Sequence, residues 1–426
     1  MPTISPARHR RPLAVAALGA AILVALTGCS LPTGDSAGGS GGGTLQIGVL
    51  APQTGTSAAD GLLAKQGAQL AIEEINAAGG VDGHKLALDV QDTKDQSAAA
   101  VTSAVSNLTS NSKVVAVATA YASTTNFEIN QLSRAKLPYL LGGNSAQTAG
   151  IVGKNPTAFP TIWSVAPSYS GYNTDLPRQL AAWDTSGEFP LRNKKAFIVS
   201  SNNPFSNGIA DGLTKTFHDE GWTVVGPDAF PFQNIDDWTT EIGKIHAADP
   251  SVVINLDYQT ANAASFLRQF SQNPTQSLVF SQYAPTVPDF EKLAGDSANG
   301  VVTNLPFAPL PKSKLGAAAI AAFQKKFGAD PGLTGVALYT EIKLWAAAAK
   351  KVGDPTKTAQ VGAAIGKLDE PTALGTVRFD PKTHLAVAGS TGIHMTYYQV
   401  QDGKLLLIGP AADAVAKFEK PSWVTP

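Results

Sequence analysis

Short apolar runs alternate with longer amphipathic stretches along most of the chain. The first run, from Leu45 to Leu50, has the apolar character of a buried strand. Apolar residues then recur at spacings of three and four from Leu63 to Ile75, which predicts a helix that ends at Gly79 and Gly80. The alternation continues with strands predicted at 86–90, 114–117 and 137–141, and with helices predicted up to residue 108 and over 124–134.

A second series of the same kind follows the Pro-containing segment 163–167. Its strands are predicted at 196–199, 222–225, 252–256 and 278–280, and its helices at 206–220, 238–248 and 261–272. Further helices are predicted at 315–327 and 336–352, and a hairpin is predicted at 397–407 with Asp402 and Gly403 in its turn. Strands that alternate with helices of this length form parallel sheets through right-handed crossovers. The pattern therefore predicts two α/β lobes.

Length, composition and charge agree with two folded units. The chain has 426 residues, of which 43% are apolar and 15% are charged. This is a globular composition with enough apolar material to fill two cores. The formal net charge is −1, so no overall field would attract a phosphate backbone, and nucleic acid is not expected as a partner.

The N-terminus has the pattern of an export signal. Basic residues from Arg8 to Arg11 precede an apolar run from Leu13 to Leu26, which is too short for a permanent membrane span. Leu-Thr-Gly then precedes Cys29, and this run resembles the lipobox of bacterial lipoproteins. On that resemblance residues 1–28 are a signal peptide, Cys29 carries the lipid, and the Gly-rich residues 29–43 form a flexible linker. Because Cys29 is the only cysteine, no disulfide is expected.

Several longer runs resemble the type I periplasmic binding proteins, and within them the branched-chain amino acid (Leu/Ile/Val) binding family of ABC importers. The most specific matches are Gly48 to Gly55 and Gly67 to Val81. The other matching runs are Asp92 with Asp95, 249–253, 266–269, 375–380 and 398–404. Together they cover essentially everything from Leu45 to Gly409.

The resemblance implies an α/β fold of two doubly wound parallel-sheet lobes joined by a three-crossing hinge. Lobe 1 would comprise 44–164 plus 305–392, lobe 2 would comprise 165–304 plus 393–426, and the hinge would lie near Val165, Asn304 and Ile393. It also implies a monomeric binding protein that is not an enzyme and uses no cofactor or metal. Its partners would be a small-molecule ligand, ABC permease and ATPase subunits, and the membrane through the lipid on Cys29, on the extracytoplasmic side.

Two loops that follow strands of lobe 1 are rich in hydroxyl groups. In open α/β sheets, ligands bind beyond the carboxyl ends of the strands, where helix N-termini offer unpaired N–H groups. Family loops in these positions hold the ligand's carboxylate and part of its amine, and on that resemblance we assign this role to Ser123, Thr124, Ser145 and Asn144, with Tyr121 beside them. Ordinary helix capping by serine and threonine is the alternative.

Aromatic residues of the opposing lobe are expected to cover the ligand. Phe205 lies in the loop after one strand, Tyr258 follows a second strand, and Gln282 and Tyr283 follow a third. Flat side chains at these places would lie over the ligand, and Trp163 would close one side. The alternative for any aromatic residue is a place in the core.

Gln282 departs from the family pattern. Amino-acid-binding members place an acidic residue near this position to pair with the ligand's ammonium, and glutamine cannot balance a buried positive charge. Either Asp257 compensates from the neighbouring loop, or the ligand carries no ammonium. Branched-chain amino acids, amides, short carboxylic acids and aromatic acids therefore all stay open as ligands.

Two other functions compete with transport. An enzyme is one, but the six histidines are scattered singly and form no metal-binding pattern. A ligand-sensing receptor of the same fold, which reports to a signalling partner, is the other. In both the importer and the receptor, ligand binding is expected to close the hinge and to favour the closed form.

Overall fold

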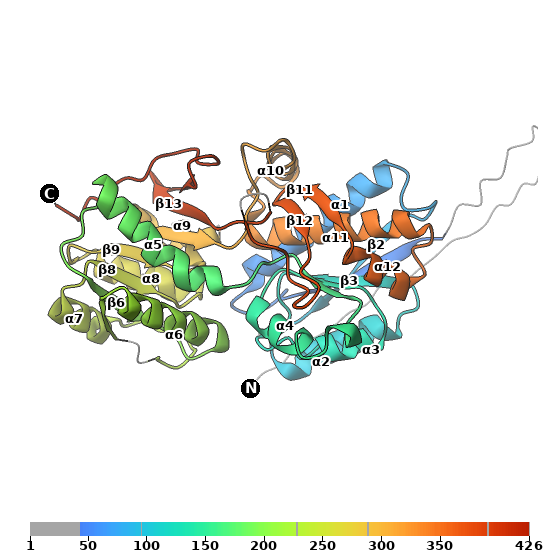
Figure 1. Ribbon diagram of the computed structural model, residues 1–426, viewed down its shortest axis with the longest axis horizontal. Helices are drawn as coiled ribbons and strands as arrows, with labels where there is room; N and C mark the ends of the chain where they lie inside the picture. Colours follow the sequence, from blue (N-terminus) through green and yellow to red (C-terminus); the bar gives the residue numbers. More distant parts are fainter. Residues whose placement is uncertain (1–42, 95, 227–228, 288, 390–391, 426) are drawn as a thin grey trace, which may run out of the picture. The chain divides into compact units, whose positions relative to one another are not determined.

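The computed structural model describes residues 43–94, 96–226, 229–287, 289–389 and 392–425. The predicted signal peptide, the lipidation of Cys29 and the family match at Asp95 lie outside these residues. Within them the chain forms two α/β lobes, each built on a separate and mainly parallel sheet (Figure 1). This confirms the predicted fold class. No helix in this part of the chain has both the length and the apolar character needed to cross a bilayer.

The first sheet has five parallel strands in the order β2-β1-β3-β4-β5. The strands are β1 Leu45–Ala51, β2 Leu86–Asp92, β3 Val114–Thr119, β4 Tyr139–Leu141 and β5 Ile162–Ser164. The helices that connect them are α1 Ala58–Ala77, α2 Ala98–Ser110, α3 Ile129–Arg134 and α4 Ser145–Val152. The strand order reverses between β1 and β3, and such a reversal creates a crevice at the carboxyl ends of the strands where ligands bind.

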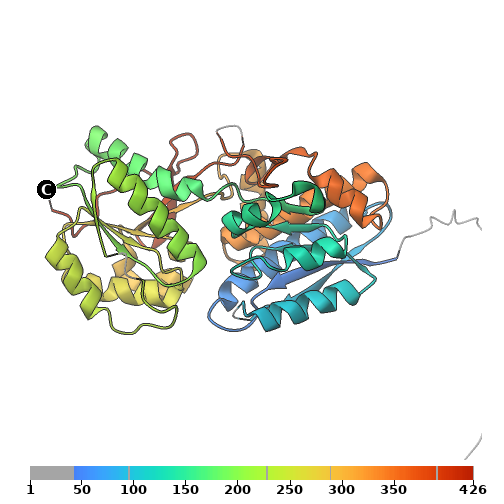
Figure 2. The same ribbon diagram turned by 60° about the horizontal axis from the view of Figure 1, so that its bottom comes forward.

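Both faces of this sheet are buried. Successive side chains of a strand point to opposite faces, so Val49 and Ala116 lie on one face while Leu50 and Val117 lie on the other. Helices α1 and α11 (Gly332–Val352) cover the first face, and α2 and α3 cover the second (Figures 1 and 2). The central strands β3 and β4 are therefore almost wholly apolar, as buried parallel strands are.

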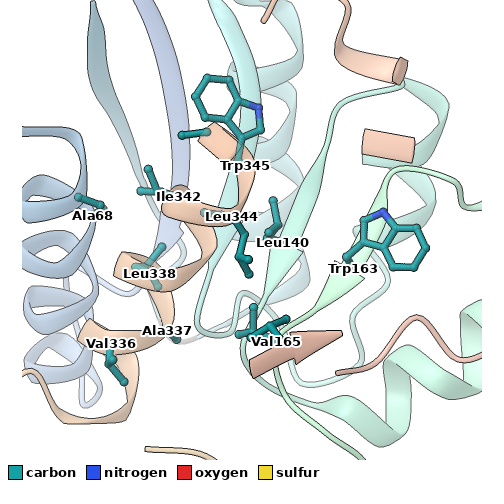
Figure 3. Close-up of a cluster of buried hydrophobic side chains, with 14 of the residues drawn as sticks. Ala68, Leu140, Trp163, Val165, Val336, Ala337, Leu338, Ile342, Leu344 and Trp345 are labelled. Carbon is teal, nitrogen blue, oxygen red and sulfur yellow. The ribbon is translucent and has the colours of Figure 1, made fainter. Parts of the chain in front are cut away.

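The core between α11 and the sheet contains large side chains beside small ones. Figure 3 shows Leu344 of α11 pointing toward Leu140 of β4, with Trp345 on the next position of the helix. Helix α1 comes very close to α11, because Gly67 lies against the backbone of Gly335. Small residues at this crossing allow the two helices to approach one another.

The second sheet has seven strands in the order β14-β13-β10-β9-β8-β6-β7. Five of them are parallel, and β13 and β14 form an antiparallel hairpin at one edge. The strands are β6 Lys195–Val199, β7 Thr223–Val225, β8 Val252–Asn255, β9 Leu278–Ser281, β10 Val302–Leu305, β13 Thr396–Gln401 and β14 Lys404–Gly409. The helices of this lobe are α5 Ser170–Ser186, α6 Pro204–Asp219, α7 Thr239–Ala248, α8 Thr260–Phe270 and α9 Asp289–Ala294.

This sheet too is covered on both faces. Ile198 and Ile254 pack with α5 and α6, whereas Phe197 and Val253 pack with α7, α8 and α9. Figure 1 shows α5 and α6 on one side of the strands and α8 and α9 on the other. The alternation along two neighbouring strands therefore produces two separate cores in this lobe as well.

The chain passes between the two sheets three times. The first passage lies between β5 and α5, and the second leads from β10 to α10 (Lys314–Phe327), which contacts α1. The third passage leads back to the second sheet and precedes β13. Between the second and third passages the chain forms α10, α11, α12 (Thr358–Ile365) and a small hairpin of β11 (Asp369–Thr372) and β12 (Gly375–Arg378).

Several short elements were not predicted from the sequence, among them α4, α9, α12 and β10, and two further segments differ for a physical reason. The helix predicted over 124–134 begins only at Ile129, because Asn126 has a left-handed backbone (φ 54°) and the preceding residues form a loop. Helix α5 was not predicted at all. It contains Pro177, which disfavours a helix interior, yet residues at helical spacing anchor it in the lobe 2 core: Tyr172, Leu176, Leu180 and Trp183.

Candidate functional site

A cavity of about 60 Å³ lies at the carboxyl ends of the strands of both lobes. Lobe 1 contributes loops that follow β2, β3 and β4, and lobe 2 contributes the starts of α5 and α6 and the loops after β8 and β9. The volume is that of only a few water molecules. The lining residues are Gln96, Ala120, Tyr121, Thr124, Gly143, Asn144, Tyr169, Tyr172, Phe205, Tyr258, Tyr283 and Leu333.

Aromatic rings form most of this lining. Phe205 is at their centre, with its ring centroid 5.8 Å from that of Tyr169 and 5.6 Å from that of Tyr258, both nearly perpendicular to it. Tyr169 in turn lies 5.1 Å from Tyr172, one turn further along α5. Edge-to-face contacts of this kind restrict the orientation of the rings. The lobe 2 side chains that line the cavity are therefore held in place by one another.

Asp60 lies behind two of the lining tyrosines. It stands in the first turn of α1, is 7% exposed, and through Oδ2 accepts hydrogen bonds from the hydroxyls of Tyr121 (2.6 Å) and Tyr283 (2.7 Å). Burial raises the pKa of Asp60, and the two hydroxyl donors oppose this shift. The positive end of the helix dipole also favours its charged form.

The two tyrosine hydroxyls act as donors because their pKa values are far from neutrality. Burial, reinforced by the charge of Asp60, raises the pKa of Tyr121 and of Tyr283 well above the ordinary value of 10.0. Both phenols therefore keep their protons and direct them at the carboxylate. Tyr283 is held there with a left-handed backbone (φ 68°), which is strained for a bulky residue and typical of functional positions.

Hydrogen bonds join the two lobes around the cavity. The Asp60–Tyr283 bond connects α1 of lobe 1 to the loop after β9 of lobe 2. Tyr169 of lobe 2 donates its backbone N–H to Ser145 Oγ (3.0 Å) and accepts the Asn144 N–H at its hydroxyl (2.9 Å). Each lobe therefore presents polar groups that are satisfied only by the other lobe.

Six of the expected site residues line the cavity. They come from both lobes and are Tyr121, Thr124, Asn144, Phe205, Tyr258 and Tyr283. Thr124 is half-buried, and its hydroxyl makes no hydrogen bond with the described residues. Asn144 uses its side-chain amide to donate to the Ser123 carbonyl (2.7 Å).

The other four expected residues have different neighbours. Ser123 is buried and donates its hydroxyl to Glu128 Oε2 (2.6 Å), and Ser145 is buried with its oxygen facing Tyr169. Trp163 belongs to the core of lobe 1, where it stacks on His384 at 4.0 Å and donates to the Gly362 carbonyl. Gln282 is 1% exposed and donates to the Asn304 carbonyl. None of these four side chains is part of the cavity lining.

Several residues near the cavity were not predicted from the sequence. Asp60 could have been noticed, because it is an acidic residue in the first turn of the helix that follows the first strand. Tyr169 and Tyr172 are three residues apart, which places them on one face of α5, but no element was predicted there. Gln96 of lobe 1 lines the cavity together with Tyr258 of lobe 2, and no pattern in the sequence marks that pair.

The hydroxyl of Ser123 yields a prediction about stability. Glu128 is fully buried and accepts from Ser123 and from the Tyr139 hydroxyl (3.0 Å), while burial raises its pKa. Ser123→Ala would leave one donor for this carboxyl and is expected to lower the free energy of unfolding by about 1.5 kcal/mol in urea denaturation. Ser106→Ala, which removes an exposed hydroxyl from α2, is the control and is expected to change stability by less than about 0.5 kcal/mol. Equal stabilities of the two variants would contradict the role assigned to Ser123.

Comparison with known proteins gives consistent results for sequence and fold. The family described as periplasmic binding protein matches residues 44–404. The Leu/Ile/Val-binding protein BraC3 of Rhizobium johnstonii is 25% identical over 373 residues, which cover 85% of this chain and 93% of that protein.

Solved structures of two proteins have the same fold. A putative branched-chain amino acid ABC transporter from Silicibacter pomeroyi has a TM-score of 0.81 at 25% identity, and the match covers 89% of this chain and 100% of that one. A branched-chain amino acid transporter substrate binding protein from Streptococcus pneumoniae, in complex with isoleucine, has a TM-score of 0.70 at 20% identity, with 86% and 100% covered.

Proposed function

Because this chain belongs to the periplasmic binding protein family, in its branched-chain amino acid branch, we propose that it is the extracytoplasmic solute-binding protein of an ABC importer. It captures a small polar metabolite between its lobes and delivers it to the permease. Relatives of this chain carry names of amino-acid-binding and transport proteins, and the proposal assigns it no catalytic step. In this role the protein is anchored to the cell membrane through a lipid on Cys29.

The observation that carries the proposal is the cavity lined by both lobes. It lies beyond the carboxyl ends of the parallel strands, where open α/β sheets bind small molecules. Its lining combines aromatic surface with a few polar groups, such as Thr124 and Asn144. That composition is typical of sites that bury a small organic molecule.

The small volume of the cavity supports a hinge mechanism. A space of about 60 Å³ is smaller than the pockets that hold metabolites, so the lobes must separate for a ligand to enter. Three chain passages connect the two sheets in the described part of the chain, so the lobes can rotate once the bonds between Asp60 and Tyr283 and around Tyr169 are broken. A ligand that contacts both lobes would favour the closed form.

A thermal-shift screen followed by scattering tests this function. The purified full-length protein is screened against amino acids, amides, small organic acids and amines, and we expect one chemical class to raise the melting temperature. Small-angle scattering with a compound that binds should then show a smaller radius of gyration. A verified ligand that produces no compaction would contradict the clamp mechanism.

Thr124→Val provides the matching site variant. It keeps the shape of the side chain, removes a hydroxyl that lines the cavity, and is expected to weaken ligand binding about fivefold in calorimetry. Thr109→Val, which removes a hydroxyl from α2 away from the cavity, is the control and should bind the ligand with unchanged affinity. Unchanged affinity in both variants would exclude Thr124 as a ligand contact.

A further inference from the structure

The described residues that line the cavity carry no formal charge of their own. None of its described lining residues is a lysine, arginine, aspartate or glutamate, and the carboxyl of Asp60 behind them is bonded to two lining tyrosines. Asp60 forms no salt bridge with any basic side chain in the described part of the chain, and its shifted pKa has only burial and the two tyrosines as causes. Among the described residues, the lining therefore contains no basic side chain, and two of its tyrosines are bonded to a buried carboxyl.

The two tyrosines present this negative charge to the cavity. Their rings line the space, while both hydroxyls donate to the same carboxylate oxygen, Oδ2. A phenol that donates to a carboxylate becomes a stronger acceptor, because hydrogen bonds in a chain polarise one another. Oδ1 of Asp60 accepts no hydrogen bond from the described residues. A positively charged donor in the cavity would find two suitable oxygens here, those of the two phenols that line it.

The remaining walls suit the same kind of group. Six aromatic rings surround the cavity, and aromatic faces attract cations through the negative charge of their π systems. The rings of Tyr169, Tyr172, Phe205 and Tyr258 stand opposite the loops of lobe 1. A carboxylate in the same place would lie among these rings, close to two tyrosines that are bonded to a buried carboxyl.

Three of the four groups expected to hold a ligand carboxylate are already engaged, and Thr124, whose hydroxyl has no partner among the described residues, is the exception. The Ser123 hydroxyl donates to Glu128, and the Asn144 N–H donates to Tyr169. Gln282, where the family pattern places an acid, is buried outside the cavity and bonded to the Asn304 carbonyl. The negative charge therefore comes from lobe 1, through Asp60, and not from the Gln282 loop of lobe 2.

From this arrangement we propose that the cavity takes an organic ligand whose charged group is a cationic amine, and that Asp60 is the counter-charge that selects it. The inference rests on the proposed solute-binding function and narrows its ligand class. The apolar part of the ligand lies among the tyrosine and phenylalanine rings. A ligand carboxylate is not required for binding.

Calorimetry with compounds of matched carbon skeleton tests this assignment on the full-length protein. One set is leucine, 3-methylbutylamine and 4-methylpentanoate, and the other is phenylalanine, 2-phenylethylamine and 3-phenylpropanoate. We expect at least one of the two amines to bind and neither of the two acids to bind.

Asp60→Asn should weaken binding of the amine at least tenfold, whereas Glu128→Gln should change the affinity for the amine less than threefold. Glu128 is the matched control, because it is another buried carboxyl that accepts from a tyrosine hydroxyl, but its partner Tyr139 does not line the cavity.

The outcomes separate this inference from the function on which it rests. If an acid binds and the amines do not, the amine assignment is wrong and the solute-binding function stands. Amine binding that Asp60→Asn leaves unchanged would exclude Asp60 as the counter-charge. If Asp60→Asn does not fold, as circular dichroism would show, the comparison of amines with acids on the unchanged protein still decides the ligand class. If none of the six compounds binds, the amine assignment is wrong. The wider thermal-shift screen then decides whether the proposed solute-binding function is wrong as well.

Discussion

Gly67→Ala is expected to lower the free energy of unfolding by about 3 kcal/mol or more. Gly67 lies in α1 at its crossing with α11, and a Cβ atom built there would be 1.9 Å from the carbonyl oxygen of Gly335. The obstacle is backbone, which cannot rotate away as the end of a side chain can. The two helices would have to separate, and the buried surface between them and the first sheet would be lost. Chemical denaturation followed by circular dichroism measures the effect.

Gly208→Ala is the matched control for this variant. Gly208 is exposed in α6, and no atom lies within 4 Å of the position of its added Cβ. Alanine is a better helix former than glycine, so stability should rise by about 0.5–1 kcal/mol. If both variants had the same stability, close packing of α1 on α11 would not be a major contribution to the fold of lobe 1.

Asp257→Asn is expected to remove a fall in stability that the unchanged protein shows as the pH rises. Asp257 follows β8 and has no exposed surface. Its carboxyl accepts hydrogen bonds from the Asn262 amide (2.6 Å) and from the Gln259 N–H (3.1 Å). Burial raises its pKa from 3.8 to about 6, against the effect of these donors. The folded state therefore binds the proton more tightly than the unfolded chain does.

The sign of the effect follows from proton linkage. Between pH 3.8 and pH 6 the folded state holds more protons than the unfolded state, so stability decreases as the pH rises through this window. A shift of about two pKa units corresponds to about 3 kcal/mol. This contribution is complete below pH 3.8 and lost above pH 6. Urea denaturation from pH 4 to pH 8 should show the stability of Asp257→Asn rising relative to the unchanged protein by that amount.

Asp249→Asn is a control of opposite sign. Asp249 is exposed, and its hydrogen bond with Arg192 lowers its pKa, so its contribution is lost as the pH falls and not as it rises. Asparagine also tolerates the left-handed backbone of this position (φ 44°). A difference curve for Asp257→Asn that stays flat from pH 4 to pH 8 would mean that Asp257 titrates normally.

Features that depend on neighbours along the chain were predictable. The apolar run of β1 and the three-and-four spacing in α1 predicted a strand and a helix close to their observed bounds. This was possible because the periodicity of a buried face appears among residues that are close together along the chain. The ends of strands were predictable for the same reason. Phe205, Tyr258 and Tyr283 were expected in the site because each follows a strand of a parallel sheet, and all three line the cavity.

Tertiary contacts decided which side chains of those loops face the cavity. Ser123 and Thr124 are adjacent and chemically similar, yet Ser123 is held by Glu128 while Thr124 lines the cavity. Trp163 likewise does not line the cavity, because its ring stacks on His384 in the core of lobe 1. A loop has no repeating pattern that fixes the direction of a side chain, so its partners elsewhere in the fold determine it.

Asp60 illustrates what sequence alone leaves open. Its two hydroxyl donors are 61 and 223 residues away along the chain, and one of them belongs to the opposite lobe. Local pattern determined that this protein has two α/β lobes with aromatic and hydroxyl residues at the ends of their strands. The tertiary structure decided that a buried carboxylate stands behind those residues, because only the packing of the two lobes brings the three side chains together.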